Sequence, residues 1–541
     1  MKNIIITSLL LINCFINPFY FTQSSCEESY TIEIPSHIDP SEGSFDIEII
    51  NNLSANETLH IDFDDSFIME DTYGKNDIYG GLSNNHLEIT QGDNSRHTIT
   101  VDIEGMPAGD WHGHIGLSVS LHRQEPSYVI IDGQSLNQVL SELDPRTITF
   151  TKGYSNIEPY CDVSMAQDGS VGLHVYGHDV IIATCDDNKV VFNDDMSMAF
   201  KDLRNLETVD FLNAVDSGQM ADASSLFENC ARLSSINGIA GLDASSCEDM
   251  SKMFKSCESI EHLDLSLWQT DRCNDMSKIF YFMDELVSPG DLSSWSIANV
   301  HDISGMFEGC DSLNDIGDIS GWDTSSCNDM SRLFYYCGML EDIGDISSWD
   351  VEANISFSSM FEGAGLLSLG DVQNWNVSDK ANDLSHMFDN AVVPSSMNLC
   401  NWDVSNVVNM SGMFKNCSSL QNLDISSWDT GNLADASMMF SIDKTGVRSS
   451  LQSIYGLSNL KTSSLLDISY MFYKCSNLSS TGYELWDVSR ILDMSYAFYA
   501  GYYLDLTCFD NWIINPSCNY SEAFGGRAGL RSGTSAPSWY S

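Results

Sequence analysis

The sequence is poor in positive charge. Lys and Arg number 24 of 541 residues, against 77 Asp and Glu, which gives a formal net charge of −53. Nucleic-acid binding needs Lys and Arg to neutralise phosphates, and attraction to anionic lipid needs the same sign of charge. The composition therefore excludes a nucleic-acid partner, argues against an anionic lipid surface, and favours solubility through self-repulsion.

Long apolar runs and catalytic motifs are also missing. Beyond the N-terminal segment, no stretch reaches the roughly 18 to 20 apolar residues of a membrane span. We find no Gly-x-Ser-x-Gly, phosphate loop, paired zinc-ligand motif or dinucleotide fingerprint. The repeats described below hold three His, namely His262, His301 and His386, at unrelated positions. We therefore expect no membrane span, no enzymatic activity, no cofactor and no metal.

The N-terminus has the layout of a secretory signal. Lys2 precedes a mostly apolar run, Ile4–Ile12, and small polar residues end the segment near Ser24. We predict a signal peptide over residues 1–24 and a secreted or cell-surface protein. A lipoprotein acylated at Cys26 is the alternative, disfavoured because the residue three positions earlier is not aliphatic. The C-terminus shows no anchoring motif.

Two β-rich regions follow. Period-two alternation, as in Tyr-Thr-Ile-Glu-Ile from Tyr30, recurs between polar turn clusters and predicts an immunoglobulin-like β-sandwich over residues 25–126. The strand-rich stretch 127–195 leads directly into a repeat array. We interpret it as the N-terminal cap that covers the first open edge of the array.

The repeats can be counted from the aromatic residues. Phe recurs at intervals of 26 or 27 residues, apart from one interval of 32, and Trp recurs in the same phase. A fixed period of this length indicates a solenoid rather than a propeller, whose blades need about 40 residues. We assign residues 196–524 to the array and 525–541 to a tail. The Phe column comprises Phe200, Phe227, Phe254, Phe280, Phe307, Phe334, Phe361, Phe388, Phe414, Phe440, Phe472, Phe498 and Phe524, and the Trp column comprises Trp268, Trp295, Trp322, Trp349, Trp375, Trp402, Trp428, Trp486 and Trp512.

Each unit predicts one short strand and one short helix. In the unit that begins at Asn409, residues 420–425 carry alternating apolar residues, which is typical of a strand with an inward face. Residues 409–414 place apolar side chains at i, i+3 and i+4, after an Asn or Asp in the N-cap position. The expected fold class is α/β, a leucine-rich-repeat-like solenoid, in which the stacked Phe and Trp rings form the core.

The repeat resembles a known family. The run Trp-Asp-(Val/Thr)-Ser, Met-Ser-x-Met-Phe-x-x-Cys, Leu-x-x-Leu-Asp-(Ile/Leu)-Ser is similar to the repeat of about 26 residues in BspA-type leucine-rich-repeat bacterial surface proteins, which are related to repeats of mycoplasma lipoproteins. The resemblance covers residues 196–524 and implies an exported or surface protein, in several cases an adhesin. It does not cover the first β domain, and the unit between Phe440 and Phe472 is longer and lacks a Trp.

Fifteen cysteines follow the predicted signal. Nine in the array fall at two repeated positions, and one of these positions holds Val in other units, so we favour buried thiols over disulfides between stacked units. Cys161 and Cys185, in the cap, are the best candidates for a disulfide.

Three polar features could bind a ligand. An acidic row precedes the Trp residues by four positions and should point outward, either as a cation- or ligand-binding stripe or, as we favour, as a solvated charge row. His112 and His114 are a possible metal pair but are better explained as a loop feature. Residues 441–448 are an insertion that is either a docking loop or merely tolerated. The acidic row comprises Asp264, Asp291, Asp318, Asp345, Asp371 and Asp424.

We expect an adhesion or interaction module that binds an extracellular protein or glycan, from host matrix or other cells, through an exposed face of the solenoid. A structural surface-coat component without a specific ligand is the alternative. A glycan-cleaving enzyme is disfavoured, because it would need Asp and Lys or Arg grouped in one groove, and cations are sparse.

Overall fold

The structure is a computed structural model of the whole chain. It describes the strands within residues 1–123, and residues 128–540 except 155–158, 367–369, 480–481, 502–508 and 527–536. The chain forms two compact units, one of Met1–Ser127 with Ala166–Ser170, and one of Tyr128–Met165 with Val171–Ser541. None of the helices in the described residues is long and apolar enough to cross a membrane.

The first unit contains two antiparallel sheets. One has the strand order β6-β5-β10-β4-β8 with β1 also paired to β10, and the other has the order β2-β3-β9-β7. This agrees with the β-rich character predicted for the region, and β1 lies inside the predicted signal segment, whose removal stays a prediction. The strands are β1 (Ile5–Cys14), β2 (Tyr30–Glu33), β3 (Ser44–Asn51), β4 (Glu57–Phe63), β5 (Ile68–Asp71), β6 (Asn76–Ile78), β7 (Gly81–Leu82), β8 (His86–Thr90), β9 (Arg96–Asp102) and β10 (Trp111–Arg123).

The second unit begins with a helix that the sequence analysis missed. Helix α1 (Gly133–Leu143) starts after Asp132, whose side chain accepts a hydrogen bond from the Ser135 backbone N–H. Leu136 and Leu140 are buried one turn apart. The N-cap Asp and the i, i+4 Leu pair were visible in the sequence.

A six-stranded sheet links the predicted cap to the repeats. Its order is β12-β13-β14-β11-β16-β18, and β11, β16 and β18 pair in parallel. The last two strands belong to the first repeat units, so the cap extends the ladder of the repeats. The strands are β11 (Thr147–Thr151), β12 (Cys161–Asp162), β13 (Val171–Tyr176), β14 (Asp179–Thr184), β16 (Thr208–Asp210) and β18 (Ser235–Asn237), and a separate two-stranded sheet pairs β15 (Val190–Val191) with β17 (Val215–Asp216).

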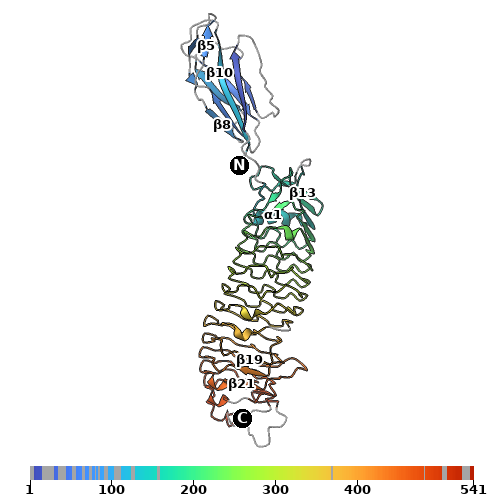
Figure 1. Cartoon of the computed structure of the whole chain (residues 1–541), viewed down its shortest axis with the longest axis vertical. Coiled ribbons are helices and arrows are strands. Elements are labelled where there is room, and N and C mark those ends of the chain that lie inside the picture. Colours follow the sequence, from blue (N-terminus) through green and yellow to red (C-terminus); the bar gives the residue numbers. More distant parts are fainter. Residues whose placement is uncertain are drawn as a thin grey trace. The chain divides into compact units, whose positions relative to one another are not determined.

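The repeat units follow one another in sequence order along the second unit (Figure 1). Short strands and 3₁₀ helices appear in some units, and the predicted inward residues Leu420, Leu423 and Ile425 are buried. Single-residue parallel bridges join equivalent positions from Asp195 to Asn519. The elements are β19 (Ser396–Asn398), β20 (Asn422–Asp424), β21 (Ser453–Tyr455), η2 (Ile239–Gly241), η3 (Ile346–Ser348), η4 (Val372–Asn374), η5 (Leu457–Asn459) and η6 (Tyr483–Leu485).

The prediction of a short helix in each unit is wrong. We call each Phe of the Phe column a ladder Phe. The turn segment of a unit runs from five residues before its ladder Phe to three residues after it. In the turn segment 222–230, Ser225 and Asn229 have φ of 56° and 63°, in the left-handed region. Alternate N–H groups, such as that of Phe227, donate to the next unit, at Met253 O, while those between them donate three residues back. These turns bury the residues at i, i+3 and i+4, as a helix would, so the apolar spacing could not distinguish the two. The repeats are therefore strand and turn rather than α/β.

The Phe column is present as predicted. All its members are buried, and adjacent ring centroids lie 5.0 to 6.1 Å apart with nearly parallel planes. Parallel units about 4.8 Å apart or slightly more bring equivalent side chains into this contact. The core therefore contains one continuous stack of Phe rings, packed among buried Leu, Ile, Met and Val side chains.

The Trp column is anchored through the indole N–H groups of eight of its nine members; the exception is Trp402, whose buried Nε1 has no hydrogen-bond partner in the described part of the chain. Trp349 Nε1 donates to Ile319 O, and Trp428 Nε1 donates to Leu399 O, both in the preceding unit. Trp539 donates to Phe509 O and stacks on Trp512 at 6.2 Å, so the repeat packing continues into the segment predicted as a tail. Trp539 follows Trp512 by 27 residues, and this interval could have predicted the continuation from the sequence. In the long unit, Leu460 takes the Trp position.

The nine array cysteines at the two repeated positions are buried thiols, as favoured. Six of them donate from Sγ to the carbonyl of a Phe in the preceding unit; Cys310, for example, donates to Phe280 O at 2.9 Å. Burial raises the pKa of the Cys310 thiol to about 12. Such thiols are unreactive, because the thiolate is the nucleophile.

The predicted Cys161–Cys185 disulfide is absent. Cys161 carries a thiol and pairs with Leu173 on β13, while Cys185 follows β14, the strand on the far side of β13. Two strand spacings of about 4.8 Å exceed the roughly 7 Å between Cα atoms that a disulfide can bridge.

Candidate functional site

The acidic row points outward, but its carboxylates are held locally. Five of its members accept the backbone N–H of a Ser two residues later, at 2.9 to 3.3 Å, and Asp371 makes no such capping bond. These bonds lower the pKa of Asp291, Asp318, Asp345 and Asp424. The side chains therefore act as turn caps, which is the role that Asp often has at such positions.

Glycines of the next unit fit closely against this row. Gly317 and Gly344 have φ of 77° and 82°, and a Cβ atom there would lie about 2 Å from the carboxylate of Asp291 or Asp318, respectively. The row is thus packed against backbone rather than arranged around a cation. The structure brings its members together along the repeats, and their role in ligand binding stays a prediction.

A second charged column lies directly after each ladder Phe, and the sequence analysis missed it. We call it the post-Phe column. Its buried carboxylates pair with cations of neighbouring units: Glu228 with Lys201 and Lys255 at 2.8 and 3.0 Å, and Glu308 with Arg332 at 3.2 Å. The members are Lys201, Glu228, Lys255, Tyr281, Glu308, Tyr335, Glu362, Asp389, Lys415, Ser441, Tyr473, Tyr499 and Gly525.

These two glutamates respond differently to their surroundings. Burial alone would raise the pKa of Glu228, but the hydrogen bonds from Lys201 and Lys255 outweigh it and lower this pKa to about 2. Burial raises the pKa of Glu308 despite the Arg332 guanidinium. Glu308 is the more buried of the two and accepts a hydrogen bond from one cation, whereas Glu228 accepts hydrogen bonds from two.

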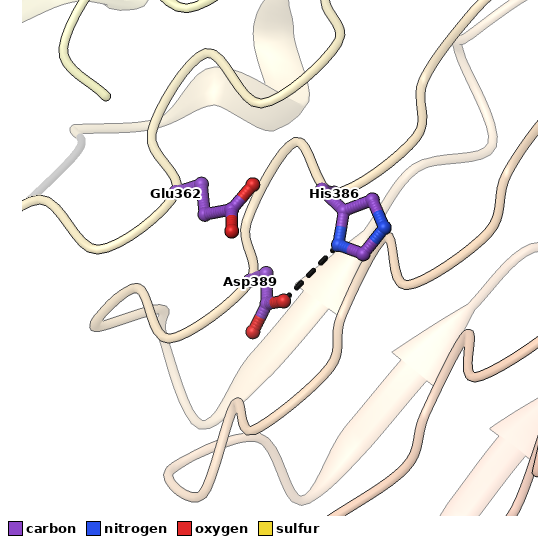
Figure 2. A group of neighbouring side chains, drawn as sticks. All are labelled: Glu362, His386 and Asp389. Atoms are coloured by element: carbon purple, nitrogen blue, oxygen red, sulfur yellow. Dashed lines mark hydrogen bonds and ion pairs between the residues drawn. The ribbon is translucent and has the colours of Figure 1, made fainter. Parts of the chain in front are cut away.

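Glu362 and Asp389 of the post-Phe column lie close to His386, and one donor atom from each of the three side chains lies within 4.8 Å of the other two (Figure 2). Glu362 comes from one turn segment, and His386 and Asp389 come from the next. His386 Nδ1 lies 3.1 Å from Asp389 Oδ2, and Ser359 Oγ donates to Glu362 Oε2 at 2.7 Å. Asp389 is 2% exposed.

The pKa values of the group reflect the proximity of two carboxylates, Glu362 and Asp389. Burial, with repulsion from Asp389, raises the pKa of Glu362. The hydrogen bond to Asp389 raises the pKa of His386, against the opposing effect of burial. His386 has φ of 54°, and its ring packs on Gly412, where a Cβ atom would lie 2.5 Å away. Gly412 thus supports the imidazole ring of His386.

The inserted loop joins this group. Lys415 Nζ lies 3.3 Å from Asp389 Oδ2 and 3.2 Å from Asp443 Oδ2, and Asn416 Nδ2 donates to Asp443 Oδ1. Burial alone would lower the pKa of Lys415, but the two carboxylates raise it. Lys444, in the same loop, lies 3.4 Å from the Asn390 side chain. The insertion is thus packed on the repeats.

Exposed aromatic side chains lie near the same turns. Phe282 and Tyr336, each two residues after a ladder Phe, are 41% and 47% exposed. Both have left-handed backbones, and their rings lie over Gly309 and Gly363 of the next unit. Tyr470, Tyr473, Tyr496 and Tyr499 stack further along. The predicted pair His112 and His114 lies on β10, where only the backbone is described.

The post-Phe column could have been found by aligning the repeats on their Phe. The position reads Lys, Glu, Lys in the first three units, an alternation of sign that predicts contacts between units. The ion pair of Arg332 and the insertion contacts could not be found, because they depend on where side chains from different positions meet in space.

Comparison with known proteins identifies the repeats. The family model described as "Mycoplasma protein of unknown function, DUF285" matches residues 194–316, 282–396, 382–512 and 446–529. Together these stretches cover residues 194–529, well over half of the chain. No curated protein and no solved structure matches.

Proposed function

The chain belongs to the DUF285 family, and we propose that it is a secreted or cell-surface adhesion protein of the BspA-like leucine-rich-repeat kind. In this proposal the repeat domain is a solenoid, which carries a binding face for an extracellular protein or glycan. The family match and the aromatic stack support the repeat architecture. The predicted signal segment supports export.

The exposed pair Phe282 and Tyr336 carries the proposal. Large aromatic side chains contribute strongly to protein interfaces, and here they are presented two units apart on a scaffold whose core is stacked rings. Lys255 and Arg332 lie 5.6 and 5.4 Å from the neighbouring Tyr281 and Tyr335 rings. Aromatic residues and Arg are enriched at the cores of interfaces.

The test is binding of the purified chain to a panel of host matrix proteins, bacterial cells and glycans. We expect saturable binding to a member of this panel, weakened at least about tenfold by the double variant Phe282→Ser with Tyr336→Ser. The control is Leu267→Ser, a side chain that is 74% exposed in another part of the repeat. Equal loss with both variants, at unchanged melting temperature, would contradict this binding face.

A surface-coat component is the second candidate, favoured only by the regular repetition of the units. It predicts concentration-dependent self-association in sedimentation experiments and no saturable ligand. Export itself is tested separately, by fractionation of cells and by N-terminal sequencing of the exported chain, which we expect to begin at Ser25.

A further inference from the structure

The repeats provide an internal comparison for Glu362. At the same position of other units, Glu228 pairs with two Lys and Glu308 pairs with Arg332. Among the residues that the structure describes, no Lys or Arg forms an ion pair with Glu362. Its neighbours are instead a second carboxylate, Asp389, and the imidazole of His386.

Side chains therefore balance the local charge only in part, through Lys415 and, when it is protonated, His386. Glu362 and Asp389 contribute two negative charges, and the nearby Lys415 divides its contacts between Asp389 and Asp443. Half-buried like charges in one place repel each other strongly, because little water screens them. One further positive charge at this point would balance the group, as the cations of neighbouring units do for Glu228.

We propose that Glu362, His386 and Asp389 bind a divalent transition-metal ion, with Zn²⁺ as the best match. The donor atoms of the three side chains all lie within 4.8 Å of one another. Ligands around a tetrahedral Zn²⁺ are about 3.4 Å apart, so a closure of at most about 1.5 Å completes the set. One imidazole and two carboxylates suit Zn²⁺ better than Ca²⁺ or Mg²⁺, which take oxygen ligands.

The surroundings resemble those of metal ligands in proteins. Ser359 donates to Glu362 Oε2, which orients that carboxylate, and Gly412 supports the His386 ring. Outer contacts of this kind fix the ligands in position. The three side chains come from two consecutive turn segments. Backbone hydrogen bonds join these segments, for example the bond from the Phe361 N–H to Met387 O.

Lys415 opposes the bound cation and gives a second, independent test. Its ammonium lies 3.3 Å from the Asp389 oxygen that also contacts His386. Replacing it with Met removes that positive charge while keeping an unbranched side chain. The Lys415→Met variant is therefore expected to bind Zn²⁺ more tightly than the natural chain, an effect opposite to that of losing a ligand.

The experiment is calorimetric titration of Zn²⁺ into the full chain at pH 7.5 after removal of metal with EDTA, repeated with Ca²⁺ and Mg²⁺. The variants are Glu362→Gln and His386→Asn, the latter because Asn tolerates the left-handed backbone. The matched control is His301→Asn, an exposed His of the repeats. Melting curves and circular dichroism of each protein establish that it is folded.

We expect one Zn²⁺ site that is weakened about 100-fold or more in both ligand variants, unchanged in the control, and strengthened in Lys415→Met. Ca²⁺ and Mg²⁺ should not reproduce it. No Zn²⁺ binding by the natural chain, or binding by both ligand variants with the affinity of the natural chain, would overturn the proposal. The binding panel described above does not depend on Zn²⁺, so either proposal can fail alone.

Discussion

Two sets of carboxylates run along the repeats, and they differ in what they contact. Members of the acidic row, such as Asp291 and Asp318, are exposed and accept an N–H from a Ser two residues away in their own unit. Glu228 and Glu308 of the post-Phe column are buried, and their partners belong to other units. The first set shapes local turns, while the second links unit to unit.

The comparison shows that density of charge is a poor guide to the role of a carboxylate. The acidic row is the more conspicuous in the sequence, yet five of its six members accept a hydrogen bond within their own turn. The post-Phe column mixes Lys, Glu, Tyr and Asp, and there burial makes every partner matter. The variants below test this difference, from the largest expected effect to the smallest.

The Phe334→Ala variant removes a ring from the middle of the Phe column. Phe334 is fully buried and stacks on Phe307 and Phe361. We expect a loss of about 3 to 5 kcal/mol in the free energy of unfolding, from lost burial plus the cavity left behind. Urea denaturation measures it, with exposed Leu267→Ala as the control. A change no larger than that of the control would show that the column is not the core.

The Glu228→Gln variant tests the links between units. Two ammonium groups would lose their shared carboxylate, so we expect a loss of about 1 to 2 kcal/mol at pH 7. The pKa of Glu228 falls from 4.5 to about 2 on folding, so its contribution is complete above pH 4.5 and is lost as the pH falls toward 2. The difference from the natural chain should therefore shrink in acid, as urea midpoints at pH 7 and pH 3 would measure.

The matched control is Glu248→Gln, which breaks the exposed pair with Arg272. Exposed pairs contribute little, so this change should be the smaller. Equal effects of the two variants would mean that burial does not distinguish the pairs.

The periodic parts of the fold were predictable from sequence. Stacked Phe and Trp rings follow from a repeat of 26 or 27 residues, because each unit alone leaves its apolar face uncovered. The burial of Met250, Met253 and Phe254 was also predictable from their spacing. These inferences need only the pattern of apolar residues.

The backbone of the turn segment and the candidate metal group were not predictable in the same way. Gly305, Gly309 and Asn416 at the left-handed positions were a signal against a helix, but Lys252 and Phe282 at equivalent positions hide it. At the position of His386, the other units hold Met, Ser, Lys, Gly, Arg, Tyr or Glu. The group around His386 depends on a single His meeting carboxylates of two units. Only the alignment of units in space places them together.

The Glu362→Gln variant should have the opposite sign to Glu228→Gln. Folding raises the pKa of Glu362, so ionising this carboxyl group destabilises the folded state. The cost is absent below the pKa of the unfolded state, grows as the pH rises, and is complete above the pKa of the folded state. In EDTA at pH 7 we expect the variant to be more stable, by less than about 1 kcal/mol. Thermal unfolding measures the difference. A destabilised variant would mean that the carboxylate is already balanced by its neighbours.

The smallest effect is expected in the acidic row itself. Asp291→Asn keeps an oxygen that can accept the Ser293 N–H, so the turn stays capped while the charge is lost. We expect the melting temperature to change by less than about 2 °C, since exposed sites contribute little. Added Ca²⁺ should not separate the variant from the natural chain, because Asp291 is occupied by its own turn. A stabilisation by Ca²⁺ that Asp291→Asn abolishes would instead make the row a cation site and reverse the roles of the two sets of carboxylates.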